Sequence, residues 1–134
     1  MKKFIFILAT LSLYLNSFSQ DFIGWTSKEL KDALAEKNPK EMEDMIYYTT
    51  EQFSQFYYLK NDTVTMHVIR FFDSKVIHQI KNQFDTKYQH IDGEDSTWMD
   101  TKNKLRIDLG LFLGKPTITV RKFGELSGRA LLNK

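Results

Sequence analysis

The sequence contains no cysteine and only 2 prolines, 6 glycines and 3 histidines among its 134 residues. Without cysteine the chain has no disulfide, no thiol nucleophile and no thiolate zinc ligand, so packing alone must hold the fold together. No two histidines lie at i and i+4 or in an HxH pair, so no local metal site is predicted. A glycine-rich phosphate loop and a G-x-S-x-G nucleophile motif are also missing. These absences argue against an enzyme and predict no cofactor.

The N-terminal segment MKKFIFILATLSLYLNSFSQD has the pattern of a secretory signal peptide. Lys2 and Lys3 precede an apolar run over residues 4–15, and Ser17 and Ser19 are the small residues that signal peptidase requires. A bilayer-spanning helix needs about 20 apolar residues, so this run is short for a permanent anchor; an uncleaved membrane anchor is the alternative. We predict cleavage after Ser19, no membrane span thereafter, and a periplasmic or secreted location of the Gram-negative bacterial type.

Neither positive nor negative charge is in excess once this segment is removed. The chain has 19 lysines and arginines against 17 aspartates and glutamates, and removal of Lys2 and Lys3 with the acid-free signal peptide leaves 17 of each. A neutral domain has no basic field to attract nucleic acid, so we expect no nucleic-acid partner. The remaining length fits one domain. We place a signal peptide at residues 1–19, the domain at 20–123 and a C-terminal tail, expected to fray, at 124–134.

Two helices are predicted from capping signals and apolar periodicity. Thr26 with Glu29 three residues later forms a capping box, and the helix that follows ends before Asn38-Pro39. A helical turn over residues 40–45 extends this region. The second helix covers residues 74–88, with an N-terminal cap from Asp73 or Ser74. Each helix carries one apolar stripe, made of Leu30, Ala33 and Leu34 in the first and of Val76, Ile77, Ile80 and Phe84 in the second.

Aromatic and β-branched segments between and after the helices are typical of strands. Asn61-Asp62 is typical of a two-residue hairpin turn, and residues 114–116 of a second turn. Residues 63–72 are apolar on both faces, which predicts a central strand, with Val64, Met66 and Val68 on one face and His67, Ile69 and Phe71 on the other. The segments lie at residues 46–49, 53–60, 63–72, 88–92, 96–100, 104–113 and 116–123.

Runs of strands after single helices predict an α+β fold. We expect an antiparallel sheet of about five to six strands with two helices packed on one face, in the order α-β-β-(β)-α-β-β-β. A helix followed by a meander occurs twice, which suggests a structural duplication without a residue-level repeat.

The opening GWTSKELKDAL, followed by FYYL and VIRFF strands, resembles the helix-then-meander unit of the β-lactamase-inhibitor-protein-like fold. Small outer-membrane-assembly lipoproteins share that unit, and short uncharacterised exported bacterial proteins have similar segments. The resemblance covers residues 24 to about 84. It implies binding to other proteins and assigns no catalytic residue. The lipoproteins carry an acylated cysteine that this chain lacks, so membrane tethering is not implied.

The segment DGEDSTWMD offers candidate binding residues, the acidic Asp92, Glu94 and Asp95 with Trp98 beside them. An exposed Trp98 could anchor a partner, whereas burial statistics favour a core position. The glycine spacing does not fit an EF-hand, so a solvated loop is favoured over a calcium site and no metal is expected. The three histidines are expected to be separate and partly exposed.

We conclude that the chain is a non-catalytic protein-interaction module whose partner is another envelope or extracellular protein. A small-molecule or lipid-binding domain, with an apolar pocket between the sheet and the helices, is the first alternative. A hydrolase whose carboxylates are brought together only by the fold is the second.

Overall fold

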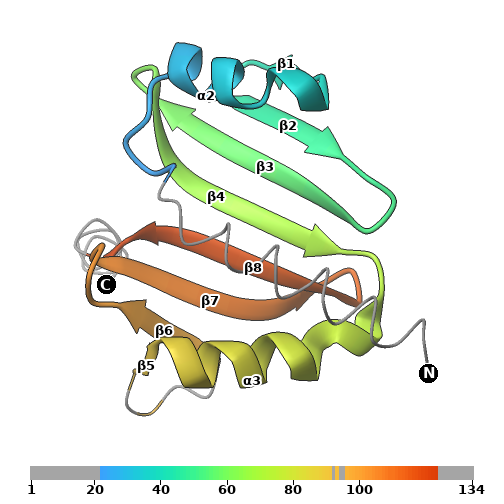
Figure 1. Ribbon diagram of the computed structural model, residues 1–134, viewed down its shortest axis with the longest axis vertical. Coiled ribbons are helices and arrows are strands. Elements are labelled where there is room, and N and C mark those ends of the chain that lie inside the picture. Colours follow the sequence, from blue (N-terminus) through green and yellow to red (C-terminus); the bar gives the residue numbers. More distant parts are fainter. Residues whose placement is uncertain (1–21, 92, 94–95, 124–134) are drawn as a thin grey trace.

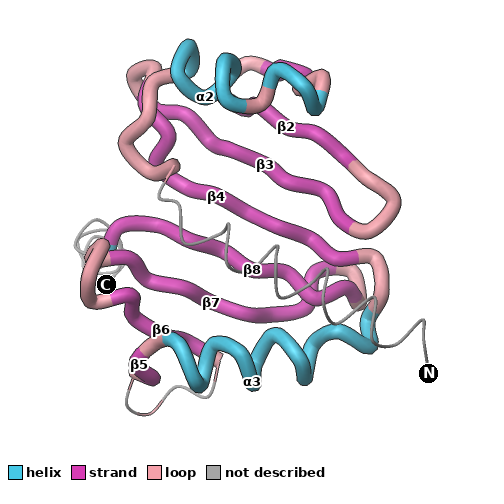
Figure 2. Tube along the Cα trace, in the orientation of Figure 1, coloured by secondary structure: helices cyan, strands magenta, loops and turns pink. Residues whose placement is uncertain are grey.

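The computed structural model describes residues 22–91, 93 and 96–123, and they form an α+β fold with one antiparallel sheet (Figures 1 and 2). Short 3₁₀ turns follow the first helix and precede the second. The helices and strands in chain order are α2 (Ser27–Ala33), β1 (Lys40–Met42), β2 (Met45–Thr49), β3 (Phe53–Lys60), β4 (Thr63–Phe71), α3 (Ile77–Lys87), β5 (Gln89–His90), β6 (Thr97–Asp100), β7 (Leu105–Phe112) and β8 (Lys115–Lys122).

The sheet has eight strands in the order β1-β2-β3-β4-β8-β7-β6-β5. It consists of two halves, each a helix followed by four consecutive strands that run from one edge to the centre. The last strand of each half, β4 or β8, lies at the centre, and these two pair antiparallel. In Figure 1, α2 lies at the edge formed by β1 and β2, and α3 at the edge formed by β5 and β6. The helix-plus-meander duplication is therefore present in the topology.

Along the central strands, buried and partly exposed side chains alternate, so the sheet has one buried face and one open face. On β4 and β8, Ile69 and Ile118 are direct cross-strand partners and both are 0% exposed. The side chains of the helices, including Leu30 of α2 and Phe84 of α3, join the same core cluster. We call this helix-covered face the inner face and the opposite one the outer face. The sequence prediction of a central strand at β4 is confirmed by its pairing with β3 and β8.

The predicted capping residues are found at both helices. Thr26 Oγ1 accepts the backbone N–H of Glu29, whose carboxylate accepts the Thr26 N–H at 3.0 Å, so the capping box is complete. Asn38 then adopts a left-handed φ of 52°, which ends the helical region before Pro39. Asp73 accepts the Lys75 N–H at 2.9 Å and caps the 3₁₀ turn that leads into α3. No helix within the described residues is long and apolar enough to cross a membrane.

The predicted number of strands was too low, because short strands carry little periodic signal. The sheet has eight strands, four after each helix, rather than about five to six. Residues 40–42 form strand β1 instead of the expected helical turn, and the chain reverses after it at Glu43, whose φ is 33°. Over so few residues the helical and strand patterns of Met42 and Met45 cannot be told apart. Strands β5, with two residues, and β6, with four, lie within the segments predicted at residues 88–92 and 96–100.

One face assignment and one turn position also differ from the sequence prediction. Val64 is 1% exposed although it was predicted to share a face with Met66, because the pairing shifts between Tyr58 and Leu59 and leaves Thr65 as an extra residue. Such a bulge reverses the alternation beyond it. The second hairpin turn lies at Leu113-Gly114, both at positive φ, and not at residues 114–116.

We predict that Ile118→Ala lowers the free energy of unfolding by about 2–5 kcal/mol, because it leaves a cavity where the two halves meet. Thr119→Ala, one residue later and on the outer face, should cost less than about 1 kcal/mol. Urea unfolding followed by tryptophan fluorescence measures both. Equal losses for the two variants would contradict the assignment of faces.

Candidate functional site

The outer face of the sheet is apolar on the side of β2, β3 and β4. Cross-strand pairing aligns Met45, Tyr58 and Met66 in one row and Tyr47, Phe56 and Val68 in a second. The rings of Tyr47 and Phe56 stack with their centroids 6.0 Å apart. These six side chains are partly exposed, Tyr58 the most at 37%. An apolar surface of this kind, left open to solvent, is typical of a contact surface.

The same rows become charged on the side of β8, β7 and β6. Tyr47's row continues through Val68 to Thr119, Asp108 and Thr97. Asp108 accepts a hydrogen bond from Thr97 Oγ1 at 2.8 Å, and its carboxylate lies 3.2 Å from Arg106 Nε and 3.5 Å from an Arg121 guanidinium nitrogen. One carboxylate thus neutralises part of the charge of two arginines. The outer face is divided into an apolar half and a charged half.

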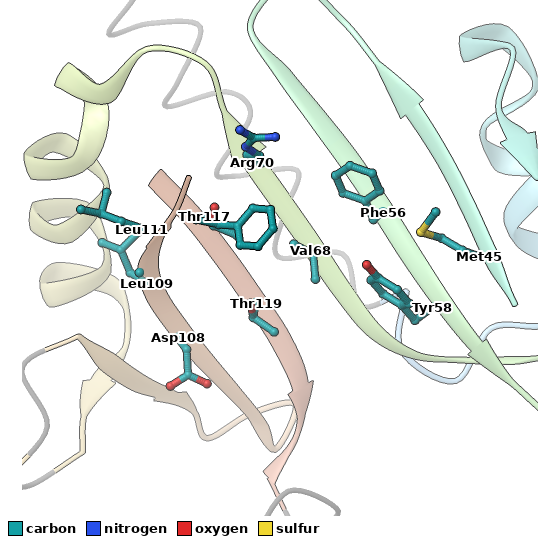
Figure 3. A pocket seen from close by; sticks show the side chains of 12 residues that line it. Met45, Phe56, Tyr58, Val68, Arg70, Asp108, Leu109, Leu111, Thr117 and Thr119 are labelled. Atoms are coloured by element: carbon teal, nitrogen blue, oxygen red, sulfur yellow. The ribbon is translucent and has the colours of Figure 1, made fainter. Parts of the chain in front are cut away.

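A groove of about 520 Å³ runs where these halves meet (Figure 3). Arg70 lies at one end of the labelled set and Asp108 at the other, while Leu109 and Leu111 point away from the groove. Gly110 leaves room in its wall, because a β-carbon built there would meet no atom within 4 Å. The lining residues are Met45, Phe56, Tyr58, Val68, Arg70, Asp108, Leu109, Gly110, Leu111, Phe112, Thr117 and Thr119.

The β7–β8 hairpin carries exposed apolar side chains, and among them Phe112 lines the groove beside Arg70. Leu111, Phe112 and Leu113 are 64%, 58% and 76% exposed. Every second residue from Leu105 to Leu113 is leucine or isoleucine, but only the first three, at residues 105, 107 and 109, are buried. The apolar alternation continues beyond the core. These side chains are free to contact a partner.

The predicted binding residues are not brought together at this surface. Trp98 is 0% exposed, its indole N–H donates to Asp85 at 2.9 Å, and the ring of His90 stacks on it at 5.0 Å. It occupies the core position that burial statistics favoured, and its ring is not at the surface as a partner anchor. Asp92, Glu94 and Asp95 lie outside the described residues, so their role in binding stays a prediction.

The histidines are separate, but the expectation that each is partly exposed was wrong for His67. Its side chain is 4% exposed, whereas His78 and His90 lie at the surface. On the inner face, Gln55 Oε1 accepts hydrogen bonds from Tyr57 Oη at 2.8 Å and from His67 Nε2 at 2.7 Å. Since a carbonyl oxygen only accepts, His67 carries its proton on Nε2.

This buried polar cluster also includes Tyr48, and its role is to stabilise the packing of the core. Gln55 Nε2 donates to Tyr48 Oη at 2.6 Å, and the rings of Tyr57 and His67 stack at 4.2 Å. Burial raises the pKa of Tyr57 and lowers that of His67 to about 3. Both groups are therefore neutral at pH 7. Satisfied buried polar groups of this kind specify a single packing of the core.

The part of the chain that the structure describes forms no metal site, and its groove holds no pair of carboxylates. No group of three or more metal-ligating side chains lies together among residues 22–91, 93 and 96–123. Asp108 is the only carboxylate that lines the groove, and it is held by Thr97 and two arginines. Glycoside hydrolysis needs two carboxylates across the scissile bond. The groove has the chemistry of a binding surface.

Comparison of the chain with models of protein families, with curated proteins and with solved structures gave no match. The resemblance to the helix-then-meander unit of the β-lactamase-inhibitor-protein-like fold therefore stays a prediction. The groove itself was missed from the sequence. The available signal was a strand with apolar residues on both faces, residues 63–72, which indicated that the outer face also carries apolar side chains.

We predict that stability depends on pH through His67. Its pKa is about 3 in the folded chain and about 6.5 in the unfolded chain, so between these values the unfolded chain binds more protons. The free energy of unfolding should fall as the pH falls from about 6.5, by up to about 1.4 kcal/mol per pH unit. His67→Gln keeps the donor to Gln55 and cannot titrate, so its stability should fall less steeply.

Urea unfolding at a series of pH values from 7.0 to 4.5 measures this difference. The exposed His78→Gln serves as the matched control and should keep the wild-type slope. Identical slopes for the wild type and His67→Gln would show that His67 is not held neutral in the folded chain.

Proposed function

We propose that this chain is an exported, non-catalytic binding module of the cell envelope, and that the outer face of its sheet binds another protein. The N-terminal pattern of Lys2, Lys3, an apolar run and Ser17 with Ser19 supports export. The observation that carries the binding role is the open outer face, where a groove adjoins the exposed Phe112.

The composition of the outer face supports a protein partner. Interfaces between proteins are enriched in aromatic residues, methionine and arginine. Phe56, Tyr58, Met45 and Arg70 all line the groove. The partner would cover side chains that the chain's own helices, both on the inner face, leave open.

A small ligand is the second candidate, because the volume of about 520 Å³ falls within the usual range for ligand pockets. This groove lies on the outer face and not between the sheet and the helices, where the pocket was expected. It spans five strands, β2, β3, β4, β8 and β7. Strands are spaced about 4.8 Å apart, so the groove is about 20 Å wide. That width favours a protein segment over a small molecule.

We predict that Gly110→Trp abolishes partner binding without loss of folding. Its backbone is outside the left-handed region and an added β-carbon meets no atom within 4 Å, so the new side chain should project into the groove that Gly110 lines. Light crosslinking in the native envelope, followed by affinity purification of the tagged chain, should recover a stoichiometric partner with the wild type and not with this variant.

Lys28→Trp is the matched control, because it places the same ring at an exposed position of α2. It should recover the same partner as the wild type. The proposal is wrong if the wild type recovers no specific partner, or if Gly110→Trp recovers it as well. Far-UV circular dichroism and the melting temperature of each variant establish that both are folded.

We predict that the envelope form of the protein begins at Gln20. Intact mass spectrometry of the purified chain should give the mass of residues 20–134. A mass that begins at Met1 would instead identify the apolar run as a membrane anchor. This outcome would change the location of the domain and leave the binding surface as described.

A further inference from the structure

Among the described residues, Arg70 is the arginine of the outer face that has no acidic partner. Arg106 and Arg121 both lie within ion-pair distance of Asp108. Arg70, on β4, forms no ion pair with any described residue. Its buried Nε has no hydrogen-bond acceptor, which is also true of Arg121 Nε, so the missing acidic partner is what distinguishes Arg70. An incoming carboxylate that pairs with the terminal guanidinium nitrogens of Arg70 would supply the missing opposite charge.

Phe112 strengthens this site from the neighbouring hairpin. Its ring lies over the Arg70 guanidinium, with 5.5 Å from the guanidinium carbon to the ring centroid. The ring excludes water from one side of the cation, and a charge with less water around it binds an anion more strongly. The guanidinium presents two parallel N–H donors in a geometry that matches a carboxylate.

A space for an apolar side chain lies next to this cation. Arg70 is the cross-strand partner of Thr117, and Thr117 is the partner of Gly110, so the three form one row across β4, β8 and β7. The missing side chain of Gly110 leaves this end of the row open. Phe56 and Val68 line the groove on its other side. Charge and apolar surface are therefore adjacent.

We propose that the groove binds a protein segment that presents an aspartate or glutamate beside a large apolar side chain. The carboxylate pairs with Arg70, and the apolar side chain lies in the space at Gly110 between Phe112 and Val68. This inference rests on the proposed function and names the chemistry of the partner. A second copy of the chain and a small carboxylic acid are the competing occupants.

The test is selection of an mRNA-displayed library of random twelve-residue peptides against the full chain, with counter-selection against Gly110→Trp. We expect enrichment of peptides with Asp or Glu next to an aromatic or large aliphatic residue. Selection against Arg70→Gln should lose the acidic residue from the enriched set. Enriched peptides without an acidic preference would overturn the inference and leave a protein-binding outer face standing.

Fluorescence-anisotropy titration of one selected peptide then isolates the ion pair. Arg70→Gln should weaken binding at least about tenfold, as expected for a hydrogen bond to a charged group. Exchange of the peptide's Asp or Glu for the corresponding amide should weaken it equally, and this half of the test leaves the protein unchanged. In the doubly changed pair the two losses should not add, because both remove one interaction.

Arg121→Gln is the matched control, since it makes the same substitution on the same face at an arginine already paired with Asp108. It should change the affinity less than about twofold. An unchanged affinity for Arg70→Gln would overturn the inference. A dimer of the wild type in sedimentation equilibrium that Gly110→Trp abolishes would also overturn it. A small acid bound to the wild type in the native mass spectrum would do the same.

Discussion

β4 and β8 pair at the centre of the sheet, and among the described strands this pair is the only one that joins the two halves of the sheet. Ile69 and Ile118, partners in this pair, are about 50 residues apart in the chain. Each half alone would have four strands, one helix and an unpaired last strand. Joining the halves at these last strands leaves only the short β1 and β5 as edges. Short edges limit pairing with other chains.

Pairing β4 with β8 also determines what the outer face can be. It places the apolar rows of the first half directly against the polar rows of the second, with Val68 beside Thr119. Asp108 holds Arg106 and Arg121 within ion-pair distance on its own half. Arg70, on the apolar half, has no such partner in the part of the chain that the structure describes. The electrostatic asymmetry of the groove therefore follows from the register of one strand pair and the position of one carboxylate.

Local signals in the sequence were sufficient for the helices and the long strands. The capping box at Thr26 and the alternation of Leu105, Ile107 and Leu109 each depend on near neighbours, and the structure has both. The three-residue strand β1 forms because it pairs with the longer β2, which no short window of sequence reveals. The bulge at Thr65 likewise depends on the register with β3.

The candidate site was predictable only as a class of surface. Aromatic strands without catalytic motifs indicated binding, but the groove combines β2, β3, β4, β7 and β8, whose order in the sheet is not their order in the chain. Trp98 illustrates the limit. A tryptophan beside an acidic loop fits both a surface anchor and a core residue, and only the position of α3, which brings Phe84 and Asp85 to it, decides between them.

The tip of the β7–β8 hairpin is the strongest sign that the outer face is shaped by more than stability. Leu113 has a left-handed φ of 53°, a conformation in which asparagine or glycine would be less strained. It is also 76% exposed, so its side chain contributes little to the core. Folding alone therefore favours a different residue there, and Phe112 beside it is largely exposed as well. A contact made by this tip would account for residues that the fold itself does not need.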